Sequence, residues 1–187
     1  SGPAPKSLSV AALKDRGFEK IPSYGVEPID VPGAVAGWMT LHERFGKLPL
    51  EGVMAPAIRY AEEGYPVTPN ISRLWQEAFE NYSKYRDRPE FQGWFDTFAP
   101  NNTWLKPGEM FRCPDMAKTL KEIAATKGES FYRGAIAEKI DAFFKKHNGF
   151  LTKEDLAAFK PEWVDPISVN YHGVDVWELP PNGHGIT

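Results

Sequence analysis

Between Gly33 and Pro161 the apolar side chains recur at spacings of three and four residues, and most of these runs end at a glycine or a proline. That spacing places the apolar side chains on one face of an α-helix, so it predicts a series of amphipathic helices. They are expected at about 33–46, 50–63, 69–85, 114–126, 130–147 and 152–160. The expected fold class is therefore mainly α.

The last of these helices has a recognisable start at Thr152. Its hydroxyl is expected to accept a hydrogen bond from the backbone N–H of Asp155, and acidic side chains there favour the positive end of the helix dipole. The adjacent acids Glu62-Glu63 and Glu154-Asp155 diverge by about 100° around a helix, so they cannot converge on one substrate. We interpret both pairs as solvated helix ends.

Two regions of different character flank the helices. Frequent Pro and Gly predict a loop-rich N-terminal segment with one short helix at about 9–14. Near the C-terminus, residues 167–171 and 174–179 alternate apolar and polar side chains around His172-Gly173, which predicts a small β-hairpin. The expected organisation is an extended segment at 1–30, a helical domain at 31–161, and a hairpin with a Gly-rich turn at 162–187.

Aromatic residues are expected to hold the irregular parts in place. The stretch 87–111 is rich in Pro, Gly and Asn and predicts a loop whose aromatic side chains pack onto the helices. The six tryptophans, because of their large apolar area, are assigned to the core. They are Trp38, Trp75, Trp94, Trp104, Trp163 and Trp177. The lone Cys113 is expected to be buried and inert.

Composition excludes several functional classes. A net charge of −3, with no run of like charge, gives no reason to expect nucleic acid or an anionic membrane as a partner. The apolar stretches are far shorter than the roughly 20 residues that span a bilayer. One cysteine allows neither an internal disulfide nor a thiolate metal cluster. The compartment stays open, because the sequence carries no secretory signal and a signal can be removed.

Motifs for local chemistry are absent from the sequence. There is no phosphate-binding Gly-rich loop, no nucleophile elbow and no metalloprotease motif, and the four histidines lack ligand spacing. His42 and His147 are expected at the surface, and His172 in a structural turn. Asn182, Gly183 and His184 form the one candidate binding loop, since glycine allows close approach of a ligand. A plain tight turn is the preferred interpretation of the same residues.

A series of short blocks in fixed order, from about Val31 to Gly185, resembles the γ-glutamyltranspeptidase family. The blocks are Val31–Trp38 with Phe45–Leu50, Ala57–Val67, Phe131–Ile140, Gly149–Leu156, Pro166–Ser168 with Tyr171–Gly173, and Pro180–Gly185. Each block coincides with a helix stop, cap or turn predicted above. The order of the blocks over almost the whole chain makes the resemblance specific.

The resemblance implies an N-terminal-nucleophile hydrolase with an αββα sandwich, made as a precursor that cleaves itself. The new N-terminal Thr of the small subunit then attacks a γ-glutamyl amide, and the acyl group passes to water or to an amine. No metal or organic cofactor is implied. The blocks match the central part of the large subunit, so the nucleophile lies outside this sequence and is not Thr187. No catalytic residue is expected in this piece, which would need the downstream small subunit as its partner.

The sequence does not decide which acyl group the substrate carries. In the family an Arg just ahead of an Ala-Pro pair holds the substrate α-carboxylate, whereas here Pro3 precedes Ala4-Pro5 and the first arginine is Arg16. The sequence therefore allows a γ-glutamyl enzyme, an acylase of other amides in the same family, or a non-catalytic helical interaction module. As a fragment, the chain would expose surface meant for missing sheets, which leaves self-association or domain swapping open.

Overall fold

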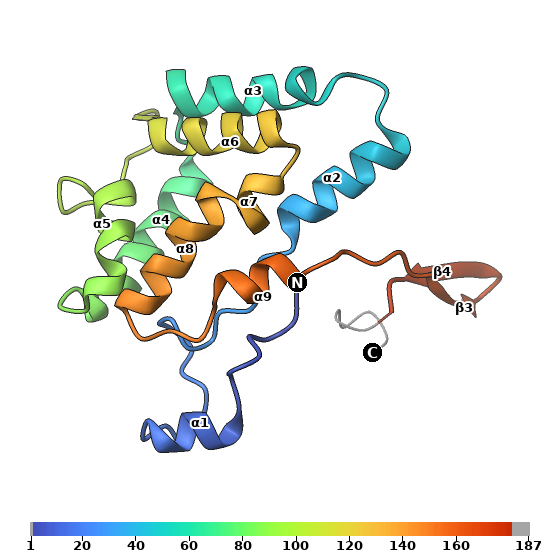
Figure 1. Cartoon of the computed structure of the whole chain (residues 1–187). Coiled ribbons are helices and arrows are strands. Elements are labelled where there is room, and N and C mark those ends of the chain that lie inside the picture. The colour runs from blue at the N-terminus through green and yellow to red at the C-terminus, as the bar shows by residue number, and fades with distance from the viewer. Residues whose placement is uncertain (1, 181–187) are drawn as a thin grey trace.

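The computed structural model describes residues 2–180 and shows a helical body from which an extended arm carries a two-stranded hairpin (Figure 1). The α-helices are α1 (Val10–Asp15), α2 (Ala34–Phe45), α3 (Leu50–Glu63), α4 (Pro69–Tyr82), α5 (Gln92–Phe98), α6 (Pro114–Thr126), α7 (Glu129–Arg133), α8 (Ala135–Lys146) and α9 (Lys153–Ala158). Two 3-10 helices, η1 (Ser83–Tyr85) and η2 (Pro89–Phe91), follow α4. The strands are β1 (Tyr65–Pro66), β2 (Met110–Phe111), β3 (Ile167–Tyr171) and β4 (Val174–Glu178).

The main core lies where α3, α6, α7, α8 and α9 meet, and α3 and α6 run side by side at one edge of it (Figure 1). Val31, Leu151 and Leu156 are among its most completely buried side chains. Val31 precedes α2, whereas Leu151 and Leu156 lie just before and within α9, so the core joins two parts of the sequence that are about 120 residues apart. The helical periodicity of the sequence thus predicted the mainly helical body, with differences in the stretches 87–111 and 130–147.

The stretch 87–111 is more regular than predicted. It contains η2, α5 and β2, and β2 pairs antiparallel with β1 through Tyr65 opposite Phe111. Phe91, Phe95 and Ala99 form a second buried cluster, against which aromatic side chains of α4 and α5 pack. Pro and Gly suggested a loop, but Pro89 occupies the first turn of η2, where its missing N–H costs nothing.

The helix predicted over 130–147 is in fact two helices, α7 and α8, divided at Gly134. The backbone of Gly134 is extended, and a Cβ built there would lie 2.9 Å from Ser130 Cα. The buried Ser130 hydroxyl accepts a hydrogen bond from the N–H of Ile136 at 3.4 Å, which supports the start of α8. Periodicity could not locate this break, because the apolar spacing continues across it.

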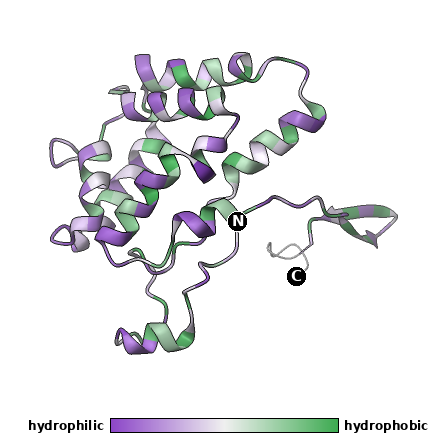
Figure 2. Ribbon diagram, in the orientation of Figure 1, coloured by the Kyte–Doolittle hydropathy of each residue, from purple (hydrophilic) through white to green (hydrophobic). Residues whose placement is uncertain are grey.

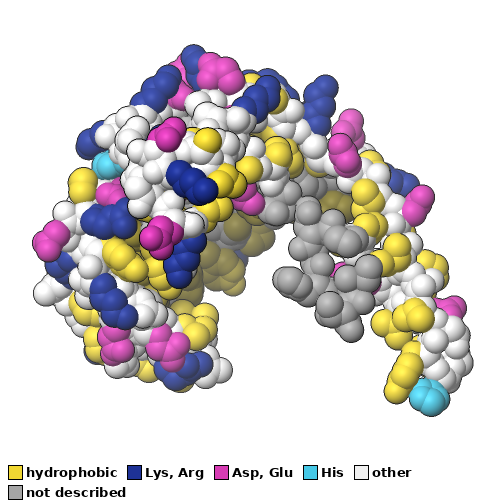
Figure 3. Space-filling view, turned by 90° about the horizontal axis from the view of Figure 1, so that it is seen from below, with side chains coloured by type: hydrophobic (Ala, Val, Ile, Leu, Met, Phe, Trp, Pro, Cys, Tyr) yellow, Lys and Arg dark blue, Asp and Glu magenta, His cyan; other side chains and the backbone are white. Residues whose placement is uncertain are grey.

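The predicted hairpin is confirmed, with Val169 opposite Val176 and Tyr171 opposite Val174. These cross-strand partners share one mainly apolar face, which also carries Ile167 opposite Glu178. The other face carries Ser168, Asn170, Asp175 and Trp177. Both strands are exposed apart from the half-buried Glu178. Green, apolar residues appear in the body and again in the hairpin in Figure 2, and Figure 3 shows apolar side chains along the arm.

The assignment of all six tryptophans to the core was wrong for three of them. Trp75 is buried, and Trp94 and Trp104 are half-buried beside other aromatic rings. Trp38, Trp163 and Trp177 are exposed. The physical reason is position: these three lie on α2, on the arm and on the hairpin, outside the core of the body. Among the described residues, Phe45 and Arg44 of α2 contact the Trp163 ring but leave it half exposed.

Candidate functional site

Residues 2–8 cross the body beside α9 and are tied to distant parts of the chain. The N–H of Gly2 donates to Val31 O at 3.0 Å, and the N–H of Val31 donates to Pro3 O at the same distance. Farther along, the Ser7 hydroxyl donates to Phe150 O at 3.2 Å. Pro5, between these ties, is fully buried. The segment that carries the Ala-Pro pair is therefore fixed on both sides.

Pro3 and Ala4 of this segment are exposed, unlike Pro5. They lie near the point where the chain leaves the body for the hairpin. A Cβ built on Gly33 would lie 3.1 Å from Cζ of Phe159, the residue after α9, and 3.6 Å from the backbone nitrogen of Gly2. The N-terminal segment, the start of α2 and the start of the arm thus converge at one junction.

Asp155 is buried at this junction, so the interpretation of Glu154-Asp155 as a solvated pair was wrong for its second member. Glu154, Glu62 and Glu63 are exposed as expected. The predicted cap is confirmed, because the Asp155 N–H donates to Thr152 Oγ1 at 3.2 Å. The Asp155 carboxylate in turn accepts from the Thr152 N–H, which completes a capping box.

Tyr132 on α7 fixes the start of α2 from inside the body. Its hydroxyl donates to Pro32 O at 2.7 Å and accepts from the Ala36 N–H at 3.0 Å. Burial raises the pKa of the Tyr132 phenol, and the hydrogen bond from Ala36 opposes that effect. A phenol held neutral in this way acts as a cap for the helix, which otherwise lacks a side-chain cap at Gly33.

Asp141 on α8 joins that helix to the start of α9. It accepts from Lys145 Nζ at 2.6 Å and from the Lys153 N–H at 3.1 Å. The hydrogen bond from Lys145 is the main cause that lowers the pKa of the Asp141 carboxyl, with a further contribution from the Lys153 N–H. The carboxylate is thereby held charged and stabilises the α8–α9 connection.

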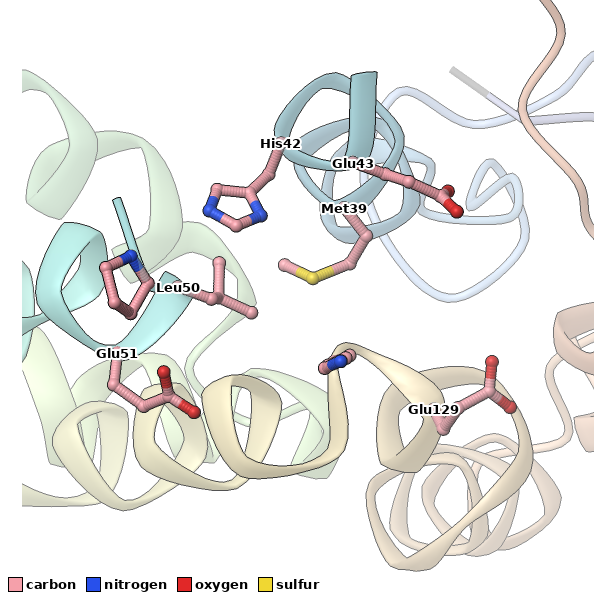
Figure 4. A pocket seen from close by; sticks show the side chains of 8 residues that line it. Met39, His42, Glu43, Leu50, Glu51 and Glu129 are labelled. Carbon is pink, nitrogen blue, oxygen red and sulfur yellow. The ribbon is translucent and has the colours of Figure 1, made fainter. Parts of the chain in front are cut away.

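A hollow of about 610 Å³ lies between α2, the start of α3 and the α6–α7 turn. Met39, His42 and Glu43 line it from α2, Leu50 and Glu51 face them from α3, and Glu129 lies across the opening (Figure 4). His42 is half-buried and its Nε2 lies 2.8 Å from Leu48 O, so the ring is engaged in holding the α2–α3 connection. No serine, threonine or cysteine lines this hollow to act as a nucleophile.

The structure places the remaining candidates separately. Asn182, Gly183 and His184 lie outside the described residues. His147 is half-buried at the end of α8, and His172 is exposed in the hairpin turn. Cys113 is partly exposed, which corrects the expectation of a buried thiol; it immediately precedes α6.

Within residues 2–180 no three His, Cys, Asp or Glu side chains are placed to hold a metal ion. Across the same residues, no helix has both the length and the apolar character needed to cross a membrane. What the described residues do provide is the fixed N-terminal junction. Sequence reasoning identified Pro3 and the Thr152-Asp155 cap there. It missed the contact of Asp155 with Lys6 and the contact of Tyr132 with Pro32, because these partners lie a hundred residues or more apart.

Comparison with known families gives a match over the whole sequence. The profile of the family described as Gamma-glutamyltranspeptidase matches residues 1–187. The glutathione hydrolase proenzyme of Pseudomonas aeruginosa is 34% identical over 98% of this chain, which covers 32% of that protein. The acylase ACY 1 proenzyme of a Pseudomonas species is 32% identical over 84% of this chain and 27% of its own length. The chain thus spans about a third of the length of these relatives.

Two solved structures extend the comparison to the fold. The cephalosporin acylase from Bacillus halodurans is 52% identical, with a TM-score of 0.96, over 100% of this chain and 35% of its own. The γ-glutamyltranspeptidase of Helicobacter pylori is 29% identical, with a TM-score of 0.85, over 98% of this chain and 52% of its own. The mainly helical fold with its small C-terminal hairpin therefore recurs as one part of these larger structures.

Proposed function

This chain belongs to the γ-glutamyltranspeptidase family, and from that membership we propose that it is the scaffold part of an acylase, an enzyme that cleaves an amide to release an acyl group other than γ-glutamyl. In this proposal the catalytic Thr stands at the N-terminus of a downstream small subunit, produced by self-cleavage. The described residues supply no nucleophile, and the isolated chain is expected to be inactive.

The observation that carries the choice of acyl group is the 52% identity to a protein described as a cephalosporin acylase, against 34% or less for the glutathione hydrolases and transpeptidases given above. Pro3 supports it, because proline carries no charge and cannot hold an α-carboxylate as an arginine fork does. We assign Pro3 and Ala4, the exposed residues of the fixed N-terminal segment, to the wall of the acyl pocket.

The test is a direct comparison of two acyl donors. The proenzyme, expressed with its downstream chain, should mature into two subunits and release the amine from a cephalosporin that carries an acyl side chain. It should turn over a γ-glutamyl anilide far more slowly. A variant with the nucleophilic Thr replaced by Ala is the control and should neither mature nor react. Faster turnover of the γ-glutamyl anilide than of every other amide would overturn the acylase assignment.

A γ-glutamyl transferase or hydrolase is the second candidate, and the similarity to the Pseudomonas aeruginosa glutathione hydrolase favours it. The same two substrates separate it from the acylase. A non-catalytic helical interaction module would instead be stable and specific for a protein partner. It predicts no self-cleavage and no turnover of either substrate when the downstream chain is present.

A further inference from the structure

The carboxylate of Asp155 divides its hydrogen bonds between two different parts of the molecule. Oδ2 accepts from the Thr152 N–H at 3.1 Å and from the Thr152 hydroxyl at 2.8 Å, which together complete the cap of α9. Oδ1 accepts from the backbone N–H of Lys6 at 3.0 Å, across 149 positions of sequence. Capping needs only the first oxygen. The second oxygen therefore has a function that the helix does not explain.

That second oxygen completes the attachment of the N-terminal segment. Gly2 and Pro3 are bonded to Val31 on one side of Ala4, and Lys6 is bonded to Asp155 on the other. A Cβ built on Gly2 would lie 2.4 Å from Val31 O, so the segment approaches its neighbour closely. After Pro5, two hydrogen bonds attach the segment to α9 and to the residues just before α9. One joins Lys6 to Asp155, and the other joins the Ser7 hydroxyl to Phe150 O. Loss of the first would leave the second alone.

We propose that Asp155 is a positioning residue: through the Lys6 N–H it holds Pro3 and Ala4 at the wall of the acyl pocket, and so contributes to the choice of acyl group. This inference rests on the proposed function, which assigns Pro3 and Ala4 to that pocket. A carboxylate is suited to the task because a charged acceptor makes a shorter and stronger hydrogen bond to an N–H than a neutral one does.

A substitution at Lys6 breaks this contact without changing the turn that contains it. The N–H of Leu8 donates to Pro5 O at 3.0 Å, so Pro5 to Leu8 form a β-turn with Lys6 as its second residue. Proline is favoured at that position. Lys6→Pro therefore suits the turn, and it replaces the N–H that donates to Asp155 by the ring Cδ, which forces the Asp155 carboxylate away from the segment. Lys6→Ala keeps the N–H and serves as the matched control.

Thr152→Val separates positioning from helix capping, because it removes the cap hydroxyl and leaves the Lys6 N–H and Asp155 Oδ1 in place. All three variants are made in the full-length proenzyme and assayed after maturation. Lys6→Pro should raise KM for the acyl cephalosporin about tenfold, the loss expected for one hydrogen bond to a charged group, and change kcat less than about twofold. Lys6→Ala should match the wild type, and Thr152→Val should lower Tm without raising KM.

Equal KM values for Lys6→Pro and Lys6→Ala would overturn the proposal, and so would a rise in KM for Thr152→Val as large as that for Lys6→Pro. A second measurement does not depend on the substrate. Lys6→Pro should speed hydrogen exchange at the Val31 amide, which donates to Pro3, relative to Lys6→Ala. If no variant turns over either donor, the proposed function fails; equal Val31 exchange in the two Lys6 variants would then refute the attachment itself.

Discussion

Leu151 and Leu156, near the end of the helical body, are 1% and 0% exposed, whereas Val169 and Tyr171 in the hairpin are 64% and 67% exposed. Both regions have the apolar periodicity of their secondary structure, 3.6 in the helices and 2 in the strands. Most of the body buries its apolar side chains within the described chain, although Trp38, Leu41 and Phe45 of α2 are exposed. The apolar face of the hairpin stays exposed. The comparison teaches that a regular apolar pattern predicts an element and its buried face, but not which part of the protein covers that face.

The largest expected difference between the regions follows from deleting one buried side chain. Leu156→Ala removes apolar volume at a fully enclosed position of the core, which should lower the free energy of unfolding by about 2–5 kcal/mol. Val169→Ala in the exposed hairpin should change it by less than about 0.5 kcal/mol. Urea titrations followed by circular dichroism would measure both. Similar losses at the two positions would refute the contrast between body and hairpin.

Tyr132→Phe tests a polar contact of the body. It leaves the Ala36 N–H and Pro32 O without their partner and should cost about 1–2 kcal/mol at neutral pH. Because folding raises the pKa of Tyr132, its contribution is complete below the unfolded pKa of 10.0 and is lost as pH rises through the higher folded value. Wild type should therefore approach Tyr132→Phe in stability at high pH; a gap that widens there would contradict the burial of a neutral phenol.

Much of the body could be predicted from the sequence, because helices are encoded by local spacing and by caps such as Thr152-Asp155. The break at Gly134 could not, since it depends on the close approach of Ser130 rather than on periodicity. The candidate site was harder still. Lys6 and Asp155 are 149 positions apart, and no local sequence pattern around either residue predicts that they contact each other. The prediction for Trp163 and Trp177 was wrong for a different reason. A large apolar side chain predicts burial, but the described residues leave both of these rings exposed.

Asp141→Asn examines the α8–α9 connection and has a smaller expected effect, about 1 kcal/mol at neutral pH. Since folding lowers the pKa of Asp141, its contribution is present above the unfolded pKa of 3.8 and is lost as pH falls through the folded value. The difference from wild type should therefore vanish in acid. Asp115→Asn is the control, because Asp115 and Lys118 form a well-exposed pair on α6 and their loss should not be measurable.

The smallest effect on unfolding, and the sharpest test of the hairpin, comes from Val176→Glu. Val176 lies opposite Val169 on the apolar face, so a charge there should prevent association through that face while changing the stability of the body by less than about 0.5 kcal/mol. Ser168→Glu puts the same charge on the opposite face, beside Trp177, and is the matched control. Light scattering after size exclusion should give a mass above 21.0 kDa for the wild type and for Ser168→Glu, and 21.0 kDa for Val176→Glu. A monomeric wild type would show that the apolar face does not drive self-association. The cross-strand pairs would then be the interactions that stabilise the hairpin in the isolated chain.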